Sequence, residues 1–179
     1  MAKKKSRKVL EASKLGSAVQ ENHSSKTVHY EGERLAALLQ RLLGEIETAK
    51  LKKGSLPEKI WIKQQFSIGV NDVTRILERM PPAERGGSDK ESPPIQIGQK
   101  PPSVQLQAVL LASDCNPRWL TKHLPSLASS RQVPLILVKD RRGGSLRLGE
   151  VVKIKTAIAL GVKARGSGIN KIIEQILQT

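Results

Sequence analysis

Three short, uninterrupted apolar runs constrain the fold of this chain more than any other sequence feature. They lie within the segments 104–112, 134–138 and 156–162. A continuous apolar run of this length is typical of a strand that is covered on both faces. Segments with helical spacing separate the runs, and helices that connect such strands cover both faces of a sheet. The sequence therefore predicts an α/β fold, a three-layer α/β/α sandwich with a small mixed sheet.

Helices are predicted before, between and after these runs. The clearest one covers 31–50, where leucine and isoleucine recur at i, i+3 and i+4. Asn116 and Pro117 suit the cap and first position of a helix that extends to about His123, and Ser145 suits the cap of another. The remaining helices are expected over 70–80, 125–131, 145–152 and 167–177.

Three segments are predicted to lie outside regular structure. Residues 1–30 carry seven lysines and arginines against two glutamates, which is typical of a disordered basic tail. Residues 58–65 alternate weakly and are interpreted as a linker within a first insertion over 54–67. Residues 81–103 contain six prolines and form a second insertion loop. The folded domain is therefore expected to cover 31–179.

The charge of the chain favours a polyanionic partner. Lysine and arginine number 31 against 16 aspartates and glutamates, a net charge of +15. Aromatic residues make up only 2% of the chain, which argues against stacking of successive bases on aromatic platforms. The run Lys3 to Lys8 suits nuclear import, phosphate contact or a merely solvated tail. A second basic group is expected in loops that lie together at one end of the sheet, which favours phosphate contact over a solvated face. It comprises Lys139, Arg141, Arg142, Arg147, Lys153, Lys155, Lys163 and Arg165.

No catalytic or metal site is expected. None of the three histidines, His23, His29 and His123, has a second metal ligand at i+3 or i+4. The single cysteine, Cys115, excludes an intrachain disulfide and a cysteine-based zinc site. Gly161, Gly166 and Gly168 lack the Lys-Ser or Lys-Thr pair of a phosphate loop. No stretch of about 20 apolar residues is present to cross a bilayer. We therefore expect no enzyme activity, cofactor, metal, small-molecule substrate or membrane partner.

The strongest candidate site is the segment that begins at Gly69. A glycine lets the backbone approach a sugar-phosphate chain, and the helix that follows directs free N–H groups at phosphates. Asn71 offers a donor and an acceptor to base edges, whereas Asp72 offers only acceptors, which suit the donors of guanine. Arg75, one turn later, is placed to reach a phosphate. The alternative is that Asn71 caps the helix and that Asp72 and Arg75 are solvated surface.

The segment 68–75, Ile-Gly-Val-Asn-Asp-Val-Thr-Arg, resembles the Gly-x-Asn-Glu-x-Thr-Lys signature of a kink-turn-binding superfamily, the ribosomal L7Ae and L30e group. The stretch 111–124 and the Val133-Pro134 step are similar to the same superfamily. The extension 76–79 and the stretch 153–161 look most like its ribonuclease P branch. The resemblance covers 31–179, apart from the two insertions.

The resemblance implies that Asn71 and Asp72 recognise a kink-turn, a sharp RNA bend beside tandem sheared G·A pairs. It also implies that a second loop covers a flipped-out base, and here the matching residues are Ile154, Lys155 and Thr156, of which Ile154 is plainly apolar. Asp72 stands where the superfamily has glutamate and is shorter by one methylene. RNA affinity is therefore expected to depend more on Arg75, Lys153 and Lys155.

The function that this resemblance implies is a non-catalytic RNA-binding subunit of a nuclear, nucleolar ribonucleoprotein. The ribonuclease P or MRP particle, which processes tRNA and rRNA precursors, is the expected assembly, with its other subunits as partners. A modification-guide particle, the ribosome or a selenocysteine-insertion complex would use the same fold and motif. A Gadd-type protein-interaction module tends to be acidic, whereas residues 31–179 carry 24 basic and 14 acidic residues. An RNA methyltransferase would need a further catalytic domain, for which we expect no room.

Overall fold

One mixed sheet of five strands organises the protein, in a computed structural model that describes residues 26–52, 56–83 and 104–179. The strand order is β1-β4-β3-β5-β2. The first three of these strands are mutually parallel, whereas β5 runs antiparallel to both of its neighbours. The strands are β1 (Thr27–Glu31), β2 (Phe66–Ile68), β3 (Leu106–Ala112), β4 (Leu135–Lys139) and β5 (Ala159–Lys163).

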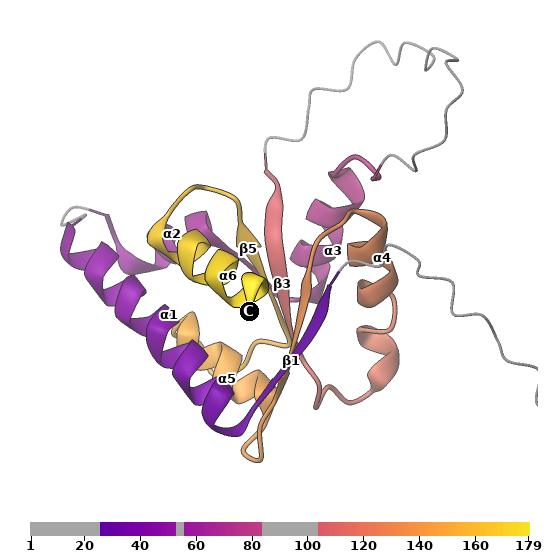
Figure 1. The fold of residues 1–179 in the computed structure, drawn as a ribbon, viewed down its shortest axis with the longest axis horizontal. Helices are drawn as coiled ribbons and strands as arrows, with labels where there is room; N and C mark the ends of the chain where they lie inside the picture. Colours follow the sequence, from indigo (N-terminus) through magenta and orange to yellow (C-terminus); the bar gives the residue numbers. More distant parts are fainter. Residues whose placement is uncertain (1–25, 53–55, 84–103) are drawn as a thin grey trace, which may run out of the picture.

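Helices cover both faces of this sheet (Figure 1). One face packs against α1 (Gly32–Lys52), α2 (Glu58–Gln65), α5 (Gly144–Val151) and α6 (Gly168–Gln178). The other face packs against α3 (Val70–Arg79) and α4 (Leu124–Ser130). The two faces bury separate hydrophobic cores, so the predicted three-layer α/β/α sandwich is confirmed.

The long helix α1 forms for the reason that its sequence suggests. One stripe of the helix is buried, and each of its five side chains is at most 3% exposed: Leu35, Leu38, Leu39, Leu42 and Ile46. The central strand β3 is buried on both faces over most of its length, as the continuous apolar run predicts. The helices expected over 70–80, 125–131 and 167–177 and the three expected strands are also present.

Two edge strands and one helix were not predicted. β1 begins at Thr27, inside the segment interpreted as a tail, and pairs with β4 through its backbone while exposing most of its side chains. The segment 58–65, interpreted as a linker, is the helix α2, which buries Trp61 and Ile62. The three residues of β2 follow it directly and pair with β5. The first insertion therefore consists largely of regular structure.

Two predicted segments lie outside the described residues. They are residues 1–25, which include Lys3 to Lys8, and most of the second insertion.

Two predicted helix starts are wrong. Pro117 has an extended backbone, and only a single 3-10 turn, η1 (Arg118–Leu120), follows it in place of a helix to His123. Ser145 does not cap α5, which begins after Gly143. The backbone N–H of Ser145 instead donates to the Asp114 carboxylate at 3.1 Å. The start of α5 is therefore held by a side chain that follows β3, a long-range contact without a local sequence signal.

Among the described helices, none has both the length and the apolar composition that crossing a membrane requires.

Candidate functional site

The candidate site begins at Gly69, between the end of β2 and the start of α3. Gly69 has φ +96° and ψ 159°, a combination that is essentially restricted to glycine. Its backbone N–H donates to the carbonyl of Ala159 at 2.8 Å, and its own carbonyl accepts from Val73 at 3.1 Å. No described atom lies within 4 Å of the position that a Cβ would occupy. Gly69 therefore turns the chain into α3 and leaves open space in front of the helix.

The first two turns of α3 expose the three polar residues of the predicted site. Asn71 does not cap the helix, because Gly69 occupies the cap position and no side-chain capping bond is formed. Arg75 Nη1 lies 3.9 Å from Asp72 Oδ1, and the two side chains are 69% and 60% exposed. An ion pair this exposed adds little stability. All three side chains are therefore accessible to a ligand.

Thr74 fixes α3 against the segment that leads into α4. Its hydroxyl lies 2.8 Å from Nε2 of His123. Beneath this hydrogen bond, Val73 and Leu77 are fully buried in the same core as Leu124. The contact joins two stretches that the superfamily resemblance covers, yet sequence reasoning missed it because the two residues are 49 positions apart.

The second predicted element, the loop 153–156, is held tightly against α5. A Cβ on Gly149 would lie 2.8 Å from the carbonyl oxygens of Ile154 and Lys155, so only glycine fits there. The Ile154 N–H donates to the Gly149 carbonyl at 3.0 Å. Ile154 is 43% exposed and Lys155 is also exposed. A fixed loop therefore presents an apolar and a basic side chain to solvent.

The loop and the start of α3 lie at the same end of the sheet. The loop leads into Ile158 and Ala159, whose carbonyls accept hydrogen bonds from Ala112 and Gly69, both at 2.8 Å. Lys153 is the exception within the predicted set, because its Nζ lies 3.5 Å from Glu47 on α1. The structure thus brings Gly69, Asn71, Asp72 and Arg75 to the same sheet end as Ile154 and Lys155, and turns Lys153 toward α1.

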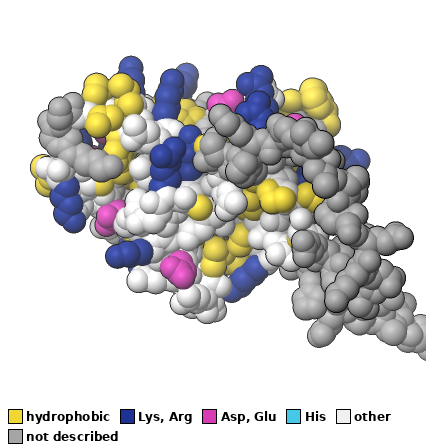
Figure 2. Space-filling model, turned by 90° about the horizontal axis from the view of Figure 1, so that it is seen from above, with side chains coloured by type: hydrophobic (Ala, Val, Ile, Leu, Met, Phe, Trp, Pro, Cys, Tyr) yellow, Lys and Arg dark blue, Asp and Glu magenta, His cyan; other side chains and the backbone are white. Residues whose placement is uncertain are grey.

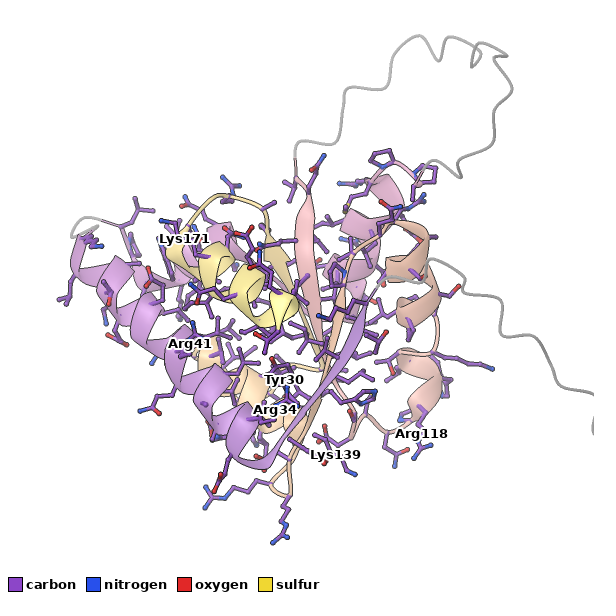
Figure 3. The ribbon with its side chains drawn as sticks, in the orientation of Figure 1. Tyr30, Arg34, Arg41, Arg118, Lys139 and Lys171 are labelled. Atoms are coloured by element: carbon purple, nitrogen blue, oxygen red, sulfur yellow. The ribbon has the colours of Figure 1, made fainter. Side chains whose placement is uncertain are left out.

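The predicted basic loops divide between the two ends of the sheet. Lys139, Arg141 and Arg142 lie at the end of β4, at the same sheet end as Gly69, and line an open hollow there. Figure 3 shows Lys139 and Arg118 toward this end and Lys171 toward the opposite one. Arg147 is paired with Asp140 at 3.4 Å and with Glu150 at 2.9 Å, and its side chain is only 24% exposed. Its role is therefore to brace the turn.

Lys163 and Arg165 lie at the opposite end, since β5 runs antiparallel to β3. The prediction that they share one surface with the other basic loops is wrong. Lys163 Nζ donates to the backbone carbonyl of Lys63 at 2.6 Å. Burial and the nearby Arg165 lower the pKa of Lys163, and Asp72 acts in the opposite direction. Figure 2, viewed onto this opposite end, also shows Lys and Arg side chains there.

The described part of the chain holds no cluster of three or more histidine, cysteine or acidic side chains that could bind a metal. Cys115 is buried and its Sγ contacts the carbonyl of Pro117 at 3.7 Å. The side chains described above for the α3 start and the loop 153–156 therefore offer hydrogen bonding, apolar contact and positive charge.

Comparison with known proteins finds similarity to one family over part of the chain. Residues 103–171 match the model of the Ribosomal protein L7Ae/L30e/S12e/Gadd45 family. The chain is 35% identical over 112 residues to the large ribosomal subunit protein eL8 of Caenorhabditis elegans. The matched stretch covers 60% of this chain and 32% of that protein. It is 29% identical over 123 residues to the ribonuclease P protein subunit p38 of Homo sapiens, covering 65% of this chain and 34% of that protein.

The p38 subunit of Bos taurus is 28% identical over 138 residues, covering 75% of this chain and 39% of that protein. This chain thus spans about a third of the length of the curated relatives that it matches. In fold it is similar to the Giardia lamblia 15.5kD RNA binding protein, with a TM-score of 0.51, 14% identity and coverage of 82% of this chain and 88% of that one. The similarity to the L7Ae/L30e family therefore covers residues 103–171, and the similarity to the solved protein concerns the fold.

Proposed function

We propose that this protein is a non-catalytic RNA-binding subunit that recognises and stabilises a kink-turn-like bend within a ribonucleoprotein. One observation carries the proposal: the Gly69–Ala159 hydrogen bond joins the exposed first turn of α3 to the strand that follows the loop 153–156. The family match supports it, and a solved protein with this fold is named as an RNA binding protein. The family match itself covers Ile154 and Lys155 but begins after the Gly69 to Arg75 segment.

The exposed polar side chains of α3 suit the recognition of bases in a distorted helix. Asn71 can donate and accept in one contact, whereas the Asp72 carboxylate accepts from the N1–H and N2–H of guanine. In a sheared G·A pair the Watson–Crick edge of guanine is not paired with cytosine, whereas in a regular A-form helix its N1–H is held in a Watson–Crick pair. The open space in front of Gly69 leaves room for a sugar-phosphate backbone to approach.

The remaining residues supply apolar cover and charge. Ile154 is placed to contact an unstacked base, and Lys155 and Arg75 to contact the phosphates on either side. Arg141 and Arg142 extend the positive surface along the same end of the sheet. Lys153 contributes only if it exchanges Glu47 for a phosphate, because these side chains form an ion pair 3.5 Å long.

The ribonuclease P or MRP particle is the assembly that we propose, with a place in the nucleus, and in the nucleolus, and with other subunits of that particle as partners. The similarity to the p38 subunits of ribonuclease P supports this assignment. The comparable similarity to a large ribosomal subunit protein favours a second candidate, an RNA-binding role in another particle. The same site would act in either case, and only the RNA differs.

The experiment that separates these assignments is cross-linking of the full chain to RNA in its own cells, followed by sequencing of the attached RNA. Asn71→Ala tests the site, and Lys171→Ala, at the opposite end of the molecule, is the matched control. The proposal predicts ribonuclease P or MRP RNA cross-linked at one bent element, with loss in Asn71→Ala only. Enrichment of ribosomal or guide RNA would move the protein to another particle. Diffuse cross-links that neither variant changes would contradict the proposed site.

A further inference from the structure

Trp119 is an aromatic side chain that the fold leaves uncovered. It is 70% exposed, whereas Tyr30, Trp61 and Phe66, the other aromatic residues of the chain, are at most 7% exposed. Trp is a large apolar side chain, and full exposure of its ring to water is unfavourable. A fold that buries three aromatic rings and exposes the fourth has left that ring available for a partner.

The backbone around Trp119 is ordered by local hydrogen bonds. Trp119 lies in the 3-10 turn η1, where the N–H of Leu120 donates to Pro117 at 3.3 Å and that of Thr121 donates to Arg118 at 3.3 Å. The exposed ring is therefore carried by a defined turn, which limits the conformational entropy that a contact would cost.

This turn lies next to the candidate RNA site. It follows β3 at the end of the sheet where α3 begins, and Figure 3 places Arg118 toward that end. His123, four residues after Trp119, is hydrogen-bonded to Thr74, which lies between Asp72 and Arg75 on α3. A ligand that contacts the first turns of α3 therefore has Trp119 within its neighbourhood.

The charge of the turn favours RNA over a protein as the partner. Arg118 and Lys122 are exposed on either side of Trp119, and the segment 115–123 contains no aspartate or glutamate. An aromatic ring with flanking cations matches a base with its adjoining phosphates, because every base has a π-face and every linkage a negative charge. A content of 2% aromatic residues argues against a series of stacked bases, but it allows a single platform.

We propose that Trp119 stacks on one nucleobase of the bound RNA, beside the bend that Asn71 and Asp72 recognise, while Arg118 and Lys122 contact the adjoining phosphates. This inference rests on the proposed function and adds to it a second point of contact. It also makes Trp119 a determinant of which RNA is preferred, since the stacked nucleotide has to lie unpaired beside the bend.

The test uses the full chain and a kink-turn RNA that carries unpaired nucleotides on both sides of the bend. Trp61 is 5% exposed and Trp119 is 70% exposed, so a change in tryptophan fluorescence on RNA binding reports mainly on Trp119. We expect RNA to quench the wild-type fluorescence, and the quenching to disappear in Trp119→Phe while RNA still binds. Trp119→Leu, which keeps an apolar side chain but removes the ring, should weaken binding about tenfold relative to Trp119→Phe.

The outcomes separate this inference from the proposed function. If Asn71→Ala weakens binding but Trp119→Leu binds as Trp119→Phe does and the fluorescence is unchanged, Trp119 does not stack on RNA and the surface belongs to another kind of partner. If the wild-type chain binds the kink-turn no better than a regular duplex, the proposed function fails and this inference fails with it. Trp119→Phe and Trp119→Leu should both keep the wild-type melting temperature, because the Trp119 side chain is 70% exposed.

Discussion

The backbone N–H of Gly69 donates a 2.8 Å hydrogen bond to the carbonyl of Ala159 and so joins the start of α3 to the start of β5. These residues are 90 positions apart in the sequence. Because of this bond, the polar first turn of α3 and the loop 153–156 are carried by adjoining strands of one sheet. Their relative position is therefore set by the fold and does not depend on a ligand.

Replacement of Gly69 by alanine should affect both stability and RNA binding. The backbone at φ +96° and ψ 159° is strained for any residue with a Cβ, so we expect Gly69→Ala to lower the free energy of unfolding by about 1–3 kcal/mol. The matched control is Gly166→Ala, also at positive φ (+67°) and also in open space, but outside the proposed site. Urea unfolding should show a loss in both variants. RNA affinity of the folded protein should fall only in Gly69→Ala, and equal RNA affinities would contradict the role of the α3 start.

Replacement of Gly149 by alanine should displace the loop 153–156 and lower stability. A Cβ at this position would meet backbone atoms of the loop at 2.8 Å, and backbone atoms can yield only by displacement of the loop. We therefore expect Gly149→Ala to lower the free energy of unfolding by about 1–3 kcal/mol. A Cβ at Gly44, within α1, would meet no atom within 4 Å beyond the backbone of its own helix. Gly44→Ala should therefore raise the free energy of unfolding by about 0.5–1 kcal/mol. A neutral effect of Gly149→Ala in chemical denaturation would show that the loop is not fixed as described.

Arg75 should contribute to RNA binding through charge. We expect Arg75→Ala to reduce the slope of log Kd against log salt concentration by about one, the effect of one lost phosphate contact. Arg79→Ala removes the same charge from the far end of the same helix, and should leave the slope close to that of the wild type. Titrations at several salt concentrations measure both slopes. Identical slopes for the two variants would assign Arg75 to the solvated surface.

Asp72 should discriminate between RNAs. Asp72→Asn keeps the size of the side chain but places an amide donor where guanine also donates, so affinity for a kink-turn should fall by about 1–3 kcal/mol. Glu78→Gln is the control, because it makes the same chemical change on an exposed residue of α3 outside the proposed contact. Isothermal titration with one kink-turn RNA compares them. If both variants bind as the wild type does, the shorter acid at this position takes no part in recognition.

Much of the fold could be predicted because its central strands and long helices carry strong local patterns. The leucine stripe of α1 and the continuous apolar run of β3 each contain enough apolar residues to define an element by themselves. β1 and β2 could not be predicted, since an edge strand with exposed side chains and a strand of three residues are defined by backbone pairing to distant partners. The helix expected from Pro117 fails because the following residues form one 3-10 turn only.

The candidate site shows the same division. The motif residues Gly69, Asn71, Asp72 and Arg75 could be singled out from sequence, and the structure brings them to the same sheet end as Ile154 and Lys155. Their contact with RNA stays a prediction. The partner of Lys153 on α1, the contact of Thr74 with His123 and the exposure of Trp119 are long-range properties without a local signal.

The most direct test of the account is the affinity of the full chain for a kink-turn RNA, compared with the same RNA in which Watson–Crick pairs replace the tandem sheared G·A pairs. Both RNAs carry the same number of phosphates, so the non-specific electrostatic contribution is matched at a fixed salt concentration. The account predicts that the kink-turn binds at least about tenfold more tightly and that Asn71→Ala removes about 1–3 kcal/mol of this preference. Equal affinity of the wild-type chain for the two RNAs would contradict it.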